Sequence, residues 1–214
     1  MGYKLYYFDV RYYAEPIRLM LTAAGKDFEE INWTMDEWLA GKKKESPTGK
    51  APWLEVDGRV IPESFAIYRF LANRYGFAGK DEFEKARVDW SADFFRETTF
   101  PSWEFFRVKA GRLPGDPDKI YQEKALPALK TAYDQVQKLL EESGSGFIVP
   151  SGLTWADLYL AENVRHANAM DDNFAGMFPF AIEYEKRVRS HPSIKDYCET
   201  RKNLRTSYCT VPGK

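Results

Sequence analysis

The segment GKAPWLEVDGRVIPES, residues 49–64, decides the fold because it combines a proline-led strand, a tight turn and a helix start. Asp57 and Gly58 stand between two apolar runs, which is a strong signal for a short β-hairpin. Ser64 stands where a helix over residues 64–75, with an apolar face, begins. The segment therefore predicts two strands followed by a helix.

The two ends of this segment are candidates for holding a small anionic peptide. A proline just before a strand exposes the backbone of the residue ahead of it, and in a tight turn its peptide bond can be cis. Ala51, just before Pro52, is therefore a candidate for pairing its N–H and C=O groups with an extended ligand. Uncapped N–H groups at the Ser64 helix start attract carboxylates. An ordinary turn and a plain serine cap are the alternatives.

The flanking sequence predicts two domains. Upstream, a strand, a helix and a strand form a βαβ unit over residues 3–8, 14–24 and 28–32. Beyond residue 81 the pattern is helix and turn only, with Pro101 expected to end or kink the first helix. Further helices are expected over residues 120–142, 154–169, 180–189 and 193–201. We therefore expect an α/β domain over residues 1–77, a linker over 78–83 and an all-helical domain over 84–214.

The helix that starts after Thr154 carries a capping signal. Thr154 is followed three residues later by Asp157, so each side chain can bond the other residue's backbone N–H group. In isolation this motif is a common structural element and predicts no activity.

The composition excludes several kinds of function. The chain has 214 residues, 44% of them hydrophobic, and 31 basic against 32 acidic residues give a net charge of −1. Such a balance provides no net electrostatic field that would attract nucleic acid or an anionic membrane surface.

Cysteine and histidine spacing gives no sign of a metal site. Cys198 and Cys209 have no metal-ligand or dithiol spacing, and His166 and His191 lie far from any acidic cluster. No apolar run is long enough to cross a bilayer, and we expect a soluble, cytoplasmic protein.

These motifs together resemble one protein family. The Lys50-Ala51-Pro52 turn with its hairpin and helix start, the strand YKLYYF at residues 3–8, and TWAD at residues 154–157 are similar to those of cytosolic glutathione transferases. The nearest class is sigma, in a form similar to nematode members. The resemblance implies a thioredoxin-like βαβ-ββα domain followed by an all-helical domain, and a homodimer.

The resemblance implies a catalytic role for Tyr7, which stands near the end of the first strand. A hydroxyl donor aimed at the sulfur of glutathione would stabilise the nucleophilic thiolate. Family members of this class use a tyrosine at the matching position. Strand alternation puts the competing Tyr6 on the opposite face of the sheet. A purely structural aromatic residue in the strand is the alternative for Tyr7.

The resemblance also implies contacts with glutathione itself. Trp38 and Lys42 would meet its glycine carboxylate, Ala51 would pair with the cysteinyl backbone, and Glu63 with Ser64 would take the γ-glutamyl carboxylate. Without the resemblance, Lys42 is an ordinary surface charge. The full set is Tyr7, Trp38, Lys42, Gly49, Lys50, Ala51, Pro52, Glu63, Ser64 and Glu97.

One of these glutathione contacts and the second-substrate pocket depend on less specific signals. Glu97 aligns with an acidic residue that reaches the ligand's amino group across a dimer, although a solvated helix face also explains it. The second-substrate pocket would be lined by aromatic and apolar side chains that can equally belong to the core, namely Val10, Tyr12, Trp103 and Tyr159. Where relatives often have a Gly-Arg pair, this chain has Tyr12 and Tyr13, so support for the thiolate is weaker or comes from Arg11.

The resulting prediction is an enzyme that conjugates reduced glutathione, as co-substrate and without a further cofactor, to small hydrophobic electrophiles. One alternative is a binding protein that carries haem or other hydrophobic anions near a dimer interface. Another is an inactive relative with the same fold, because fold alone does not settle function.

Overall fold

The computed structural model describes residues 2–200. Residues 3–75, called the first half below, contain a four-stranded sheet with the strand order β2-β1-β3-β4. Strand β1 (Tyr3–Phe8) runs parallel to β2 (Glu29–Trp33) and antiparallel to β3 (Trp53–Val56), and β3 pairs with β4 (Arg59–Pro62) through a hairpin. The predicted mixed βαβ-ββα arrangement is confirmed.

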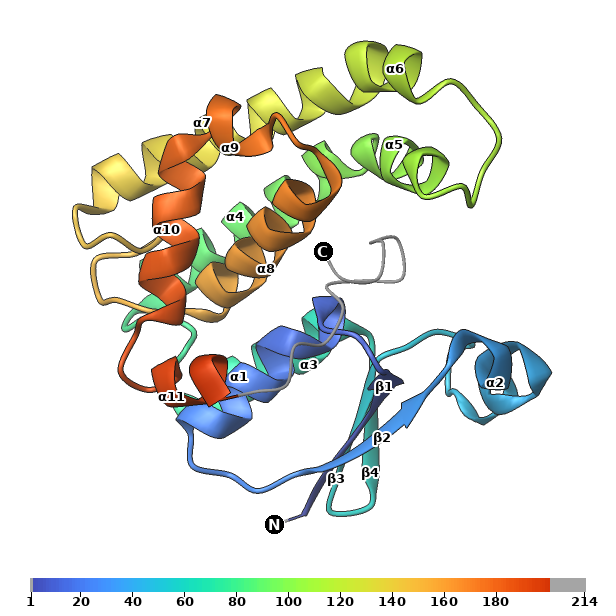
Figure 1. The fold of residues 1–214 in the computed structure, drawn as a ribbon. Helices are drawn as coiled ribbons and strands as arrows, with labels where there is room; N and C mark the ends of the chain where they lie inside the picture. Colours follow the sequence, from blue (N-terminus) through green and yellow to red (C-terminus); the bar gives the residue numbers. More distant parts are fainter. Residues whose placement is uncertain (1, 201–214) are drawn as a thin grey trace.

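The two faces of this sheet are covered differently. Helices α1 (Glu15–Ala23) and α3 (Ser64–Tyr75) lie between the sheet and the second half of the chain (Figure 1). On the other face, three tryptophans form a separate buried cluster beside the short helix α2 (Met35–Ala40): Trp33, Trp38 and Trp53. Because strand side chains alternate, β1 contributes Tyr3, Leu5 and Tyr7 to the main core.

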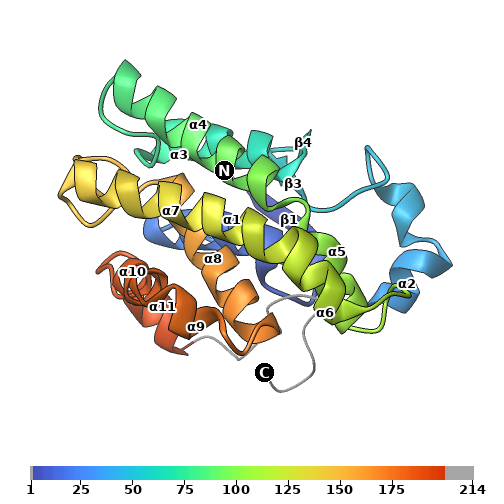
Figure 2. The ribbon, with the colours of Figure 1, turned by 90° about the horizontal axis from the view of Figure 1, so that it is seen from above.

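Residues 82–200, called the second half below, are mainly helical. Its elements are α4 (Glu82–Thr99), α5 (Ser102–Lys109), α6 (Pro117–Ile120), η3 (Tyr121–Ala125), α7 (Leu126–Ser143), α8 (Trp155–Met170), α9 (Phe174–Met177), α10 (Pro179–Arg189) and α11 (Lys195–Thr200). Helix α8 is largely buried and packs against α1, α4 and α10, so it joins the two halves (Figure 2). Within residues 2–200, no helix is both long enough and apolar enough to cross a membrane.

Several element boundaries differ from the expected ones. The helix expected over residues 120–142 begins earlier, at Pro117, and continues through the π-helical turn η3 (Tyr121–Ala125) into α7. Helix α2, with a capping box between Thr34 and Glu37, was not expected. A short helical turn, η1 (Tyr12–Ala14), precedes α1. Pro101 separates α4 from α5, as expected.

The predicted capping box at the start of α8 is confirmed, and it does more than cap the helix. Asp157 Oδ2 accepts bonds from the Thr154 N–H at 2.8 Å and the Thr154 hydroxyl at 2.6 Å. Asp157 Oδ1 accepts bonds from the Ile148 N–H at 2.9 Å and the Tyr184 hydroxyl at 2.8 Å. This buried carboxylate therefore joins the preceding loop, α8 and α10.

The two capping boxes give a matched test of this role. Asp157→Ala leaves several buried donors without an acceptor and should lower the free energy of unfolding by about 3 kcal/mol. Thr154→Ala should cost about 1 kcal/mol, and Glu37→Ala in the exposed box less than about 1 kcal/mol. Urea unfolding of the three variants measures this order. Equal, small losses for Asp157→Ala and Glu37→Ala would contradict it.

Candidate active site

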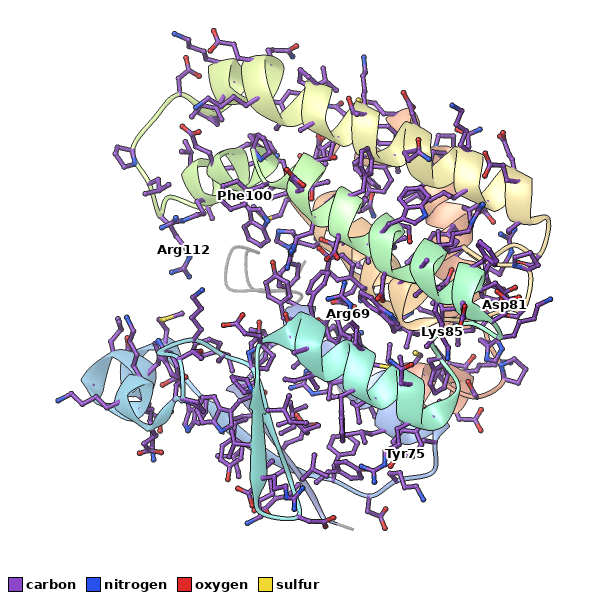
Figure 3. The ribbon with its side chains drawn as sticks, turned by 180° about the vertical axis from the view of Figure 1, so that it is seen from behind. Arg69, Tyr75, Asp81, Lys85, Phe100 and Arg112 are labelled. Carbon is purple, nitrogen blue, oxygen red and sulfur yellow. The ribbon has the colours of Figure 1, made fainter. Side chains whose placement is uncertain are left out.

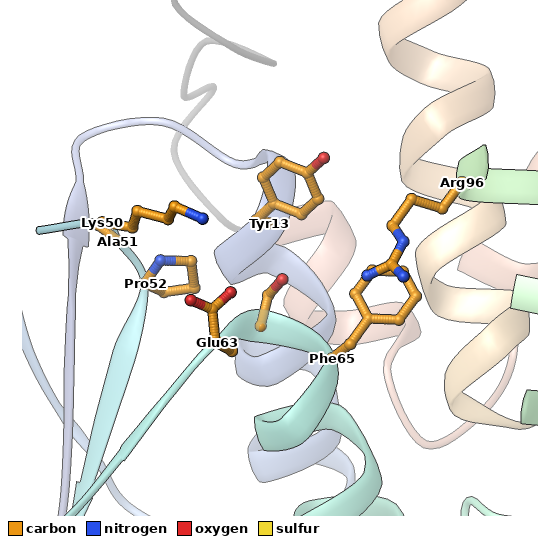
Figure 4. A pocket seen from close by; sticks show the side chains of 8 residues that line it. Tyr13, Lys50, Ala51, Pro52, Glu63, Phe65 and Arg96 are labelled. Carbon is orange, nitrogen blue, oxygen red and sulfur yellow. The ribbon is translucent and has the colours of Figure 1, made fainter. Parts of the chain in front are cut away.

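A pocket of about 190 Å³ lies where the start of α3, the turn before β3 and helix α4 meet (Figure 4). Its lining residues are Tyr13, Lys50, Ala51, Pro52, Glu63, Ser64, Phe65 and Arg96. Five residues expected to contact glutathione from sequence therefore share one pocket: Lys50, Ala51, Pro52, Glu63 and Ser64. The second half of the chain contributes Arg96, and the first half contributes the other lining residues.

One side of the pocket is the edge of the turn before β3. The Ala51–Pro52 peptide bond is cis, and the regular ladder begins only with the pairing of Trp53 and Pro62. In the part of the chain that the structure describes, the backbone hydrogen bonds outside helices and strands include none to Ala51. Ala51 thus borders the pocket with backbone groups available to an extended ligand.

The start of α3 forms the floor of the pocket. Glu63, the residue before the helix, has φ 68° and ψ 116°, a conformation that a side chain with Cβ rarely adopts. No side chain caps the helix that begins at Ser64. Its first N–H groups therefore face the pocket with the positive end of the helix dipole, which favours a bound carboxylate. Strained backbone of this kind is often found at ligand sites.

Tyr7 and Tyr6 occupy opposite faces of the sheet, as strand alternation predicts. Tyr7 is 5% exposed, belongs to the main core together with residues of α1 and α3, and is not among the residues that line the pocket. Tyr6 stacks on Trp53 with ring centroids 4.9 Å apart and donates a hydrogen bond to Glu55. Tyr7 therefore lies on the face of the sheet that α1 and α3 cover, whereas Tyr6 lies on the face with the tryptophan cluster.

Sequence reasoning missed three residues of the pocket: Tyr13, Phe65 and Arg96. Tyr13 follows Tyr12, which adopts a left-handed backbone with φ 36°, and its carbonyl accepts a 2.6 Å hydrogen bond from the Tyr68 hydroxyl. Burial raises the pKa of Tyr13, so its hydroxyl stays protonated as a donor. Arg96 reaches the pocket from α4 and lies 4.3 Å from the ring centroid of Phe65. No local sequence signal pairs these distant positions.

Comparison with known proteins identifies the family. Residues 3–73 match the model of the glutathione S-transferase N-terminal domain, and residues 115–201 match that of the C-terminal domain. Glutathione S-transferase 1 of Ascaris suum is 37% identical over 199 residues, covering 93% of this chain and 96% of the relative. The chain belongs to the glutathione S-transferase family.

Solved structures of other transferases have the same fold. Monomeric Na-GST-3 from the hookworm Necator americanus is 40% identical, with a TM-score of 0.86, covering 95% of this chain and 99% of that one. A Nu-class transferase from Haemonchus contortus is 37% identical, with a TM-score of 0.82, covering 94% and 98%. These relatives support a nematode-type transferase but not the sigma class, which stays a prediction.

The other expected glutathione contacts lie outside this pocket's lining. Trp38 is buried in the tryptophan cluster, and its ring centroid lies 5.7 Å from that of Trp33. Lys42, in the short helical turn η2 (Lys42–Glu45), forms a 2.9 Å ion pair with Glu45 and is partly exposed. Gly49 adopts φ 69° in the turn, and Glu97 is exposed on α4. Their roles in this transferase remain predictions.

Three of the four residues expected to line the second-substrate pocket are buried in the core. Val10, Tyr12 and Tyr159 are each at most 5% exposed, and Trp103 is partly exposed. Tyr12 lies against Trp103, with ring centroids 5.2 Å apart, whereas Tyr159 packs on Phe65. The burial of these three side chains fits the alternative that they belong to the core. The side of the pocket next to α4 is formed by Tyr13 and Arg96 instead.

The charge of Arg11 is directed into the core. Its side chain is 3% exposed and lies 3.8 Å from the Glu15 carboxylate. Arg11 is not among the residues that line the pocket at the start of α3. Within residues 2–200, no cluster of three or more histidine, cysteine or acidic residues is arranged to hold a metal ion.

His166 lies beneath Tyr12 and Trp103 and gives the fold a measurable pH dependence. It stacks on Trp103 with ring centroids 5.3 Å apart, and burial lowers its pKa to about 3. The unfolded chain binds a proton on this histidine below about pH 6.5, whereas the folded chain does not, so acid favours unfolding.

His166→Gln should therefore flatten the pH dependence of stability. Between pH 7 and pH 5, the wild-type free energy of unfolding should fall by about 2 kcal/mol more than that of the variant. Urea unfolding at both pH values measures the difference, with His191→Gln at a partly exposed histidine as the control. Parallel pH profiles for wild type and His166→Gln would contradict this account, because they would show that the pKa of His166 is the same in the folded and unfolded chains.

Proposed function

We propose that this transferase conjugates reduced glutathione to small hydrophobic electrophiles in the pocket at the start of α3. The observation that carries the proposal is the meeting, in one pocket, of the open Ala51 edge and the uncapped N-terminus of α3. A tripeptide with an extended backbone and a terminal carboxylate has the chemistry that these two features recognise.

In this proposal each part of glutathione has its own partners. The γ-glutamyl carboxylate accepts bonds from the backbone N–H and hydroxyl groups at Ser64, with Glu63 shaping the approach. The cysteinyl backbone pairs with Ala51. The glycine carboxylate extends along the turn of Gly49, Lys50 and Pro52 towards Trp38 and Lys42. A ligand placed this way directs its sulfur towards the β1 side, where Tyr7 lies.

The chemical step is a nucleophilic substitution or addition by the glutathione sulfur. Tyr7 donates its hydroxyl hydrogen bond to the sulfur, which lowers the pKa of the thiol, and the thiol proton passes to water. The thiolate then forms the C–S bond, and with an aryl halide the halide leaves with the electron pair. Holding both reactants together supplies the remainder of the rate gain.

Three broader assignments belong to the same proposal. With domains at residues 1–77 and 84–214, joined by residues 78–83, most of the proposed glutathione contacts belong to the first domain.

A homodimer would cover two aromatic side chains of α4 that are exposed in the single chain, Phe83 at 88% and Trp90 at 43%. It would also bring Glu97 to the ligand of the partner subunit. A cytoplasmic location supplies reduced glutathione.

Tyr7→Phe removes the proposed donor with little change in shape. A hydrogen bond to a thiolate contributes about 1.5–3 kcal/mol, so kcat/KM for an aryl halide should fall roughly tenfold to a hundredfold, with glutathione affinity retained. The measurement is steady-state conjugation, together with the thiol pKa of bound glutathione from its thiolate absorbance. Tyr6→Phe is the control, and equal activity of Tyr7→Phe and wild type would refute the assignment.

Carriage of haem or other hydrophobic anions is the second candidate function. The observation that favours it is the exposure of the aromatic side chains Phe83 and Trp90 on α4, which offer apolar contacts to a hydrophobic ligand where no dimer partner covers them. Titration with haem in the presence and absence of saturating glutathione tests it. Tight binding that is insensitive to glutathione and to Tyr7→Phe would establish a separate site, whereas haem that competes with glutathione, or does not bind, would rule that site out.

A further inference from the structure

The α4 side of the pocket carries a cation that the proposed glutathione contacts do not use. Arg96 is half exposed, and its guanidinium lies 4.3 Å from the centroid of the Phe65 ring, a distance typical of a cation–π contact. Figure 4 shows Arg96 against Phe65 on one side, with Lys50 and Glu63 on the other. Two cations therefore face the pocket from opposite sides.

The charge of Arg96 is only partly balanced by its neighbours. Its Nη2 atom lies 3.6 Å from one oxygen of Asp93, whose other oxygen lies 2.6 Å from Arg69 Nη2. Arg69 extends from α3 towards α4 (Figure 3) and also pairs with Asp89 at 3.2 Å. Among the described residues, no carboxylate other than Asp93 lies within ion-pair distance of Arg96. The guanidinium thus keeps N–H donors for a ligand.

Tyr13 completes this wall beside Arg96. Its position is fixed at the backbone by the Tyr68 hydroxyl and at the ring by Tyr12, whose centroid is 4.3 Å away. Tyr13 offers a flat ring and a hydroxyl donor, and Phe65 offers a second ring. Aromatic faces with adjacent cationic and hydroxyl donors suit a flat ligand that bears an anionic group.

We propose that Arg96, assisted by Tyr13, makes this transferase selective for aromatic electrophiles that carry a carboxylate or sulfonate. The proposal rests on the proposed conjugation, in which Ser64 and the turn at Lys50 take the carboxylates of glutathione. Arg96 then meets the anionic group of the second substrate and holds its ring beside the sulfur. The reaction is unchanged: the C–S bond forms, chloride leaves with the electron pair, and the thiol proton passes to water.

A matched pair of acceptors tests the selectivity. A chlorodinitrobenzoate and the corresponding chlorodinitrobenzamide share ring, size and leaving group and differ in charge. After correction for their uncatalysed rates with glutathione, wild-type kcat/KM should favour the benzoate, and added salt should reduce the preference. Arg96→Gln should lower kcat/KM for the benzoate roughly tenfold, leaving the benzamide and the KM for glutathione within about twofold.

Control variants separate this role from others. Arg96→Lys should keep part of the preference, and Tyr13→Phe should weaken it. Arg74→Gln removes a cation near the far end of α3, where Arg74 lies over Phe70, and should change nothing. Equal losses for both acceptors in Arg96→Gln, or a raised KM for glutathione, would overturn the inference by assigning Arg96 to glutathione or to the fold. Loss of the preference in Lys50→Gln alone would overturn it by placing the anion on the strand side.

Failure of the inference can be distinguished from failure of the proposed function. A wild-type protein that conjugates both acceptors without preference overturns only the role of Arg96. A wild-type protein that conjugates neither acceptor nor an uncharged aryl halide overturns both.

Discussion

The aromatic contact between α3 and α8 is the constraint on which the site depends. The Phe65 ring packs on Trp155 and Tyr159 with centroids 5.5 and 5.0 Å away, and Tyr68 lies 5.6 Å from Trp155. All four side chains are buried. Each such aromatic pair adds about 0.5–1.5 kcal/mol to the stabilisation from burial, so the packing holds the two halves of the chain in one relative position.

This packing determines what the pocket contains. Phe65 belongs both to the contact and to the pocket wall, and it directly follows Ser64 at the start of α3. Asp157, two residues after Trp155, fixes the start of α8 through buried hydrogen bonds. The position of α8 therefore sets where α4 brings Arg96, and a peptide site on the first half acquires a wall from the second.

Local patterns were sufficient to predict much of the first half and less of the site. The alternation in YKLYYF separates Tyr6 from Tyr7, and Ser64–Tyr75 forms a helix with the predicted bounds, because each signal lies within one element. The bonds from Ile148 and Tyr184 to Asp157 could not be predicted, since they join residues far apart in the sequence. Arg96 was missed because only tertiary packing brings it to Phe65.

The central claim is that glutathione binds between the Ala51 edge and the start of α3. Titration of isotope-labelled protein with reduced glutathione, followed by backbone amide resonances, tests it most directly. The account predicts that the largest shifts occur at Ala51, Ser64 and Phe65, and that they saturate together. Saturating shifts confined to another part of the surface, such as the two hollows beside Gln137 and Phe180, with Ala51 and Ser64 unchanged, would contradict it.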